Sequence, residues 1–308
     1  MTAASRPVPA DDLAPLLAEM VATDRFTISP DQQRAEYAEF VSMFRGPEPP
    51  FAGTITDEVI ETVKVRRYRP DNERDRGHVL IYFHGGGWVL GSADTHDRLT
   101  RAIASELGLH VISVDYRLAP EHPFPAAFED CKRVVAYAAR GATWVGVGGD
   151  SAGGNLAAAV SAERAANGEP VNAQVLIYPG LDVPAAVADK SLDGLGLDRG
   201  DIDYFWSSYR GNHQPDARLA PLLAPDPIAA PATLVTTAGC DQLLPDGVRY
   251  AQRLIAAGVS TVYLPFPGLI HGWLELAEGV PSAGQARALL IEAIGQLHRS
   301  TSQKPRSD

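Results

Sequence analysis

The chain has 308 residues, enough to bury a large core in one big domain or two smaller ones. Its composition, 45% hydrophobic and 21% charged, excludes a disordered or fibrous protein. The net charge is −11 and no basic cluster is evident, so nucleic acid is not expected as a partner, because its phosphates require a basic surface.

The sequence gives no sign of export or membrane insertion. Residues 1–12 carry a lone Arg6, two prolines and two aspartates before any apolar stretch, unlike a secretory signal. No stretch approaches the roughly 20 apolar residues of a membrane span. We therefore predict a cytoplasmic protein. Cys131 and Cys240 are interpreted as free buried thiols, with a disulfide between them as the alternative.

Strand and helix patterns alternate through the chain, which predicts a mostly parallel sheet covered by helices on both faces. The predicted strands are 59–68, 79–83, 110–114, 144–147, 174–178, 233–237 and 261–266. The predicted helices are 95–107, 128–139, 152–166, 246–257 and 282–298. Asp94 is expected to cap the start of the first helix, and Gly108 is expected to end it.

Two regions break this alternation. Residues 1–50 look helical, and residues 183–227 are rich in Asp, Gly, Pro and aromatic side chains. The second region is too long for a simple connection between strands. We expect both to pack together as a helical cap over the carboxyl edge of the sheet, where ligands bind in open α/β folds. The core then consists of 51–182 and 228–300, and 301–308 is predicted to be a disordered tail.

A glycine-rich motif, His-Gly-Gly-Gly-Trp, follows the strand 79–83 and occupies residues 84–88. Consecutive glycines leave backbone N–H groups free to converge on one oxygen, as the oxyanion of a tetrahedral intermediate requires. The alternative is a phosphate-binding loop, but G-x-G-x-x-G and G-K-[ST] are both missing. His84 is interpreted as an anchor of this loop rather than as a catalytic base.

A second motif, Gly-Asp-Ser-Ala-Gly-Gly at 149–154, joins the strand 144–147 to an alanine-rich helix. It satisfies G-x-S-x-G in the strand–turn–helix context of a nucleophile. Such a sharp turn strains the serine backbone and admits only small residues two positions to either side. It also places Ser151 at a helix N-terminus, whose partial positive charge favours an oxyanion. The simpler alternative is a turn made of small residues without catalytic function.

A third motif, at 115–127, reads Asp-Tyr-Arg-Leu-Ala-Pro-Glu-His-Pro-Phe-Pro-Ala-Ala. With all three motifs in this order and spacing, the chain resembles the hormone-sensitive lipase family of α/β-hydrolases, the bacterial family IV esterases, from about Tyr68 to the last helix. The resemblance implies an eight-stranded α/β-hydrolase sheet, with a helical cap built from the N-terminal helices and the insertion. It also implies ester hydrolysis without metal or organic cofactor, and an oxyanion hole made by the amides of Gly86, Gly87 and Ala152.

In this fold the chain order of the catalytic residues is serine, acid, histidine. His271 lies in Gly-Leu-Ile-His-Gly-Trp, just after the last predicted strand, in a setting similar to that of the family's base. Asp241 follows the strand 233–237 in a segment that resembles the family's D-P-L-x-D-E-G. This segment departs from the family pattern at Gln242, Pro245 and Asp246, which stand for proline, aspartate and glutamate. Asp246 is the competing acid, but a helix N-cap explains it.

These residues predict a serine carboxylesterase for a small-molecule ester, with Ser151 as nucleophile, His271 as base and Asp241 orienting that base. Trp88 and the cap aromatics Tyr204, Phe205, Trp206 and Tyr209 are expected to wall a small to moderate acyl pocket, which favours short to medium acyl chains. Two alternatives stay open. One is an amidase or lactonase with the same triad, and the other is an inactive relative that only binds a small ligand. Relatives often pair through the last edge strand, so a homodimer is a further expectation.

Overall fold

A single sheet of eight strands forms the centre of the computed structural model, which describes residues 7–19, 27–184, 190–226 and 228–303. The strand order is β1-β2-β4-β3-β5-β6-β7-β8. The pairs β1–β2 and β2–β4 are antiparallel and the other pairs are parallel, as the alternation of strands and helices predicts. The strands are β1 (Gly53–Ile60), β2 (Val63–Pro70), β3 (His78–Phe83), β4 (His110–Asp115), β5 (Trp144–Asp150), β6 (Ala173–Ile177), β7 (Ala232–Cys240) and β8 (Thr261–Ile270).

The predicted strand 59–68 is wrong, because the chain reverses within it. Residues 53–70 form the hairpin β1–β2, which turns at Glu61 with a φ of 57°. Hairpins usually announce such a turn with Asn-Gly or Asp-Gly, and Glu61-Thr62 carries neither signal. The alternation of apolar and polar residues continues through the turn, so the pattern does not show where β1 ends and β2 begins.

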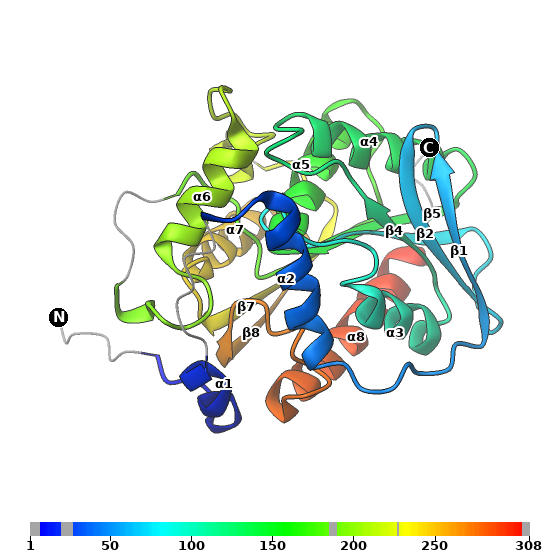
Figure 1. The fold of residues 1–308 in the computed structure, drawn as a ribbon. Coiled ribbons are helices and arrows are strands. Elements are labelled where there is room, and N and C mark those ends of the chain that lie inside the picture. The colour runs from blue at the N-terminus through cyan, green and yellow to red at the C-terminus, as the bar shows by residue number, and fades with distance from the viewer. Residues whose placement is uncertain (1–6, 20–26, 185–189, 227, 304–308) are drawn as a thin grey trace.

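Helices cover both faces of the sheet (Figure 1). On one face lie α4 (Ala126–Ala139), α5 (Ala152–Ala166) and α7 (Leu244–Ala256), which contribute Phe128, Leu156 and Tyr250 to one buried cluster. On the other lie α3 (Asp97–Leu107) and α8 (Pro281–Ser302), with Ile103 and Leu290 in a second cluster. Within the described ranges, no helix is long and apolar enough to cross a bilayer. Cys131 and Cys240 are buried, and no disulfide joins them.

Several helix ends depart from the predictions, including those of α3 and α8. Helix α3 begins at Asp97 rather than 95, and Asp94 does not cap it but pairs with Arg66, because a turn at 92–96 separates Asp94 from the helix. Gly108 ends the helix as expected, in the left-handed conformation with a φ of 60°. Helix α8 continues through Ser302, two residues into the predicted tail, while 304–308 lie outside the described residues.

Asp246 has a different role from the predicted cap of its own helix, because α7 already begins at Leu244. Its carboxylate accepts the backbone N–H groups of Leu181 at 2.9 Å and Asp182 at 3.0 Å. These amides belong to the segment that follows β6. Asp246 therefore fixes that neighbouring segment rather than the start of α7.

Two helices from distant parts of the chain form the cap. Helix α2 (Pro30–Met43) and helix α6 (Arg199–Arg210) lie across the molecule in front of the sheet (Figure 1). They are joined by a hydrogen bond of 2.9 Å from Gln33 Nε2 to Tyr204 Oη. Short elements accompany them: η1 (Asp11–Leu13), α1 (Ala14–Glu19), η3 (Lys190–Leu192) and η4 (Pro221–Leu223). Of the predicted cap, residues 1–6, 20–26, 185–189 and 227 lie outside the described residues.

Arg34 attaches the cap helix α2 to the core. Its guanidinium makes a two-pronged ion pair with Glu121, at 2.7 and 3.0 Å. It also donates to the carbonyl oxygens of Val89, at 2.9 Å, and Ala119, at 3.1 Å. The fork geometry of arginine suits this bidentate contact. Part of the third sequence motif therefore serves to hold the cap beside the glycine loop.

Candidate active site

Ser151 sits at the turn between β5 and α5, with a φ of 52° and a ψ of −117°. A non-glycine residue reaches this conformation at a cost of about 1–3 kcal/mol, and only where its surroundings enforce it. Close packing around the neighbouring glycines holds Ser151 in this conformation, because a Cβ on Gly149 or Gly153 would overlap the carbonyl oxygen of Phe83. The turn thus projects the serine side chain beyond the carboxyl ends of the strands.

His271 and Asp241 complete a hydrogen-bonded relay with Ser151. His271 Nε2 lies 2.8 Å from Ser151 Oγ, and Nδ1 lies 2.8 Å from Asp241 Oδ2. A carboxylate can only accept, so Nδ1 carries the proton and Nε2 is free to accept the serine hydroxyl proton. The other carboxylate oxygen of Asp241 accepts the backbone N–H of Leu243 at 2.8 Å, which fixes its orientation.

An irregularity in the sheet brings these two residues together. The register of β7 and β8 is regular as far as Ala238 and Phe266, and then shifts so that Cys240 faces Ile270. The extra residues of β8 include Pro267, which is tolerated because β8 is an edge strand. The bulge directly precedes His271, so it sets the position from which the imidazole reaches Ser151.

The pKa of His271 is determined by burial and nearby carboxylates. Burial on its own lowers the pKa, but Asp241, followed by the more distant Glu275 and Asp150, outweighs this effect and raises it above the usual value. The ring of Tyr178 packs edge-on against the imidazole, with centroids 4.9 Å apart. The arrangement favours the protonated, imidazolium form of this ring.

The glycine loop presents its amides to the same place. Gly86 and Gly87 have φ values of 108° and 60°, and both line the cavity above Ser151 together with Ala152. In the described part of the chain, none of these three amides has a hydrogen-bond acceptor. A Cβ on Gly87 would overlap the ring of Phe205, so the cap rests directly on the loop. Unobstructed donors of this kind can bind a developing oxyanion.

His84 anchors the loop from below. It is buried, stacks on Tyr116 with ring centroids 4.2 Å apart, and Tyr116 Oη donates to its carbonyl oxygen at 2.7 Å. Burial lowers the pKa of His84 to about 3, so the ring stays neutral. His84 Nδ1 lies 2.8 Å from the carbonyl oxygen of Gly85. The histidine that hydrogen-bonds to Ser151 is His271, so His84 contacts the loop and not the serine.

The serine opens into a cavity of about 920 Å³ between the strand ends and the cap. This volume is near the upper end for small-molecule sites and includes room for both sides of an ester. Trp88, Phe205 and Trp206 line it, as expected. Tyr209 lies behind this wall, where it is fully buried and stacks on Trp88 with centroids 4.4 Å apart. Tyr204 bonds to Gln33 rather than lining the cavity.

Sequence analysis missed a charged cluster behind the glycine loop. It comprises His96, Asp150 and Glu275, with Tyr37 of the cap attached to it. No spacing in the sequence joins these residues, because they come from four separate segments. Asp150, which directly precedes Ser151, contacts Tyr82 and Gly85 through its carboxylate.

Among the residues that the structure describes, two groups of side chains have the composition of a metal site: His96, Asp150 and Glu275, and a second group formed by Asp75, His78 and His298. In the second group, His78 Nδ1 and His298 Nε2 lie 2.9 Å apart and hydrogen-bond to each other. In the first, a histidine lies between two carboxylates. In each group, histidine nitrogens thus already have partners within the group.

The fold and the relay define a nucleophilic hydrolase of the α/β class, and comparison with known proteins agrees. Residues 80–275 match the profile of a family described as having the alpha/beta hydrolase fold. The carboxylesterase NlhH of Mycobacterium tuberculosis is 38% identical over 256 residues, covering 78% of this chain and 80% of its own. The ethyl acetate hydrolase of Pseudomonas putida is 32% identical over 285 residues, covering 86% and 90%.

Solved structures give the same result. An ester hydrolase from the metagenome of Lake Arreo is 34% identical and superimposes with a TM-score of 0.86, over 96% of this chain and 100% of the other. The chain therefore belongs to the α/β-hydrolase fold family, in its hormone-sensitive-lipase-like branch, as the sequence motifs indicated.

Proposed function

We propose that Ser151, His271 and Asp241 are the catalytic triad of this protein, a serine carboxylesterase that acts on small esters. The enzyme class follows from the family and from the curated carboxylesterases that the chain is similar to. The single observation that supports the triad is the relay of two 2.8 Å hydrogen bonds in a cavity lined by unobstructed amides.

In the proposed reaction, His271 Nε2 takes the proton of Ser151 as the hydroxyl oxygen attacks the ester carbonyl. The amides of Gly86, Gly87 and Ala152 bind the oxyanion, and the alcohol leaves with the proton held by His271. Water, deprotonated by His271, then hydrolyses the acyl-enzyme. Asp241 keeps the imidazole in the tautomer that this sequence needs.

The decisive experiment compares the wild-type protein with Ser151→Ala on p-nitrophenyl butyrate. We expect turnover to fall by on the order of 10⁴- to 10⁶-fold while the melting temperature stays near that of the wild type. A phosphonate inhibitor should add covalently to the wild type and not to the variant, as detected by intact-protein mass. Undiminished hydrolysis by clean Ser151→Ala protein would overturn the triad.

We further propose that the enzyme prefers short to medium acyl chains. Trp88, Phe205 and Trp206 close part of the cavity, and the name of one relative, ethyl acetate hydrolase, denotes a two-carbon acyl group. An acyl-length series of p-nitrophenyl esters tests this, and matched anilides separate an esterase from an amidase. A preference for long chains would contradict the proposal.

A cytoplasmic location and pairing of two copies through β8 are also proposals. Val262 and Tyr263 on this edge strand expose 48% and 37% of their surface, which supports an interface there. Light scattering of the wild type and of Val262→Lys tests the pairing, with a monomer expected only for the variant. Cell fractionation tests the location.

A further inference from the structure

A buried ion cluster joins three segments that carry the proposed chemistry. His96 Nε2 lies 3.4 Å from Asp150 Oδ2 and 3.3 Å from Glu275 Oε1. Asp150 directly precedes the nucleophile Ser151, and Glu275 follows the base His271 by four residues. His96 itself lies under the glycine loop, with its ring centroid 5.5 Å from that of His84. The side chains of His96, Asp150 and Glu275 expose only 2%, 1% and 7% of their surface.

Two carboxylates favour a positive charge on His96. Its Nε2 faces Asp150 Oδ2 and Glu275 Oε1, and the backbone nitrogen of Gly85 lies 3.3 Å away on the same side. Its Nδ1 lies 2.9 Å from the hydroxyl oxygen of Thr95, which can donate or accept. Although burial opposes this charge, Asp150 and then Glu275 raise the pKa of His96 to about 10.

Asp150 connects this imidazolium to the glycine loop. Its Oδ1 accepts the backbone N–H of Gly85, the first glycine of the loop, at 3.0 Å, and the hydroxyl of Tyr82 at 2.6 Å. The contact is close, since a Cβ on Gly85 would overlap Asp150 Oδ2. His96 lowers the pKa of Asp150 against the opposing effect of burial, so the carboxylate stays ionised.

Glu275 extends the cluster in two directions. Its Oε1 accepts the hydroxyl of Tyr37 at 3.0 Å, and Tyr37 belongs to the cap helix α2. Its Oε2 has no hydrogen-bond partner among the described residues and lies on the side of Gly272, next to His271. Glu275, which lies in the same turn as His271, thus contacts both the cap and the imidazolium.

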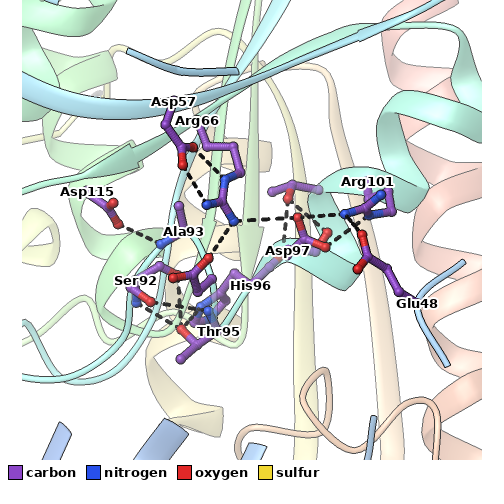
Figure 2. Close-up of polar contacts among 12 residues, drawn as sticks. Glu48, Asp57, Arg66, Ser92, Ala93, Thr95, His96, Asp97, Arg101 and Asp115 are labelled. Atoms are coloured by element: carbon purple, nitrogen blue, oxygen red, sulfur yellow. Dashed lines mark hydrogen bonds and ion pairs between the residues drawn. The ribbon is translucent and has the colours of Figure 1, made fainter. Parts of the chain in front are cut away.

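The imidazolium is held firmly in place by its own segment. Figure 2 shows Ser92 and Thr95 bonded to each other beside His96, and Arg66 bridging Asp57 to this turn. On the far side Asp97, the next residue, is bound by Arg101 at 3.0 Å. Contacts on both sides of His96 fix its position in the chain. Its ring can therefore orient Asp150 and Glu275, which pair with it.

We propose that Glu275 is a positioning residue of the reaction: it holds the loop of His271 to the glycine loop through His96, and it ties both to the cap through Tyr37. This inference rests on the proposed triad. Glu275 acts through other groups, because it contacts His96 and Tyr37 rather than Ser151. Loss of its charge should therefore disturb the alignment of base and oxyanion hole more than substrate binding.

Glu275→Gln, which keeps the shape and removes the charge, is the main test. With p-nitrophenyl butyrate we expect kcat to fall about tenfold and KM to change by less than about twofold, because misalignment affects the transition state.

The pH profile gives a second readout. The groups that face His271 are Asp241, Glu275, Asp150, Tyr178 and Ser151. Removal of the Glu275 charge lowers the pKa of His271, so the acid limb of the profile should move to lower pH.

Glu278→Gln is the matched control. Glu278 lies three residues further along the same segment, accepts the backbone N–H of Gly46 at 2.9 Å and pairs with Arg98 and Arg287 away from the cavity. It should change neither kcat nor the acid limb. A merely structural role for Glu275 would lower the melting temperature without moving that limb. Wild-type kcat and an unmoved limb in Glu275→Gln would overturn the proposal.

Tyr37→Phe tests the connection to the cap and covers the case in which Glu275→Gln does not fold. It removes one hydroxyl, and we expect kcat to fall about threefold. Tyr263→Phe loses a comparable hydroxyl bond, to Thr237 at 2.8 Å on β7, and should behave as the wild type. Unchanged kcat in Tyr37→Phe would overturn the link to the cap. Hydrolysis by the wild type and its loss in Ser151→Ala, measured in the same assay, keep these outcomes separate from the triad, which fails if Ser151→Ala stays active.

Discussion

The turn around Ser151 and the ion cluster around His96 lie on either side of the same glycine loop, yet they are built in opposite ways. The turn is set by neighbours in sequence, since Gly149 and Gly153 flank the serine and press against β3. The cluster gathers single side chains from four segments that are up to 238 residues apart. A local motif is visible in a sequence because its spacing is fixed by backbone geometry. A cluster of distant partners has no such spacing and shows itself only in the folded chain.

The largest effect should come from breaking the local region. In Gly153→Ala the new Cβ would overlap the carbonyl oxygen of Phe83, so strand and turn must separate. We expect the free energy of unfolding to fall by about 1–3 kcal/mol and turnover to fall by about 10²-fold or more. Chemical denaturation and ester kinetics measure both. Gly141→Ala, where the added Cβ meets nothing within 4 Å, is the control and should stay close to wild type.

The pH dependence of the wild type reports on both regions at once. His271, the proposed base, must be neutral to accept the serine proton, and the carboxylates around it raise its pKa above the usual value of about 6.5. We therefore expect kcat/KM to drop as the pH falls, with a midpoint above about 6.5 and a slope of about tenfold per pH unit. A midpoint below that of a free imidazole would mean that burial outweighs the carboxylates.

The charge of the cavity predicts a preference among substrates. The carboxylates of Glu36, Asp182, Asp198 and Asp246 line it. The lining arginines are already paired, Arg249 with Asp182 and Asp246 and Arg199 with Asp203. A negatively charged acyl group should therefore be repelled. We expect kcat/KM for the mono-p-nitrophenyl ester of glutaric acid to be about tenfold lower than for p-nitrophenyl pentanoate. Added salt should narrow this gap, and equal rates at low salt would contradict it.

The smallest effect is expected at the attachment of the cap. Arg34→Ala removes the ion pair with Glu121 and the bonds to Val89 and Ala119. The cap helix α2 should become less well placed, so KM should rise about threefold with a smaller change in kcat. Arg140→Ala, whose exposed partner is Glu61, controls for the loss of a surface arginine. A fall in kcat alone would show instead that Arg34 acts on the glycine loop.

The sequence predicted most of what depends on local pattern. Helix α5 runs over 152–166 as expected, and the parallel strands fall where their apolar runs lie. Ser151, His271 and Asp241 meet because their motifs follow strands that end at the same edge of the sheet. The β1–β2 hairpin was missed because its turn residues are untypical. The bonds of Asp246 and Glu275 were missed because their partners are remote in sequence.

The close approach of Phe205 to Gly87 has a consequence for anyone who would reshape this enzyme. The ring of Phe205 occupies the volume that a side chain at position 87 would need. In a redesign of α6 for new substrates, Ile202 and Trp206 are therefore better positions to vary than Phe205, because they line the cavity without supporting Gly87. A change at Phe205 would trade selectivity against rate, because the same ring supports the backbone of the proposed oxyanion hole.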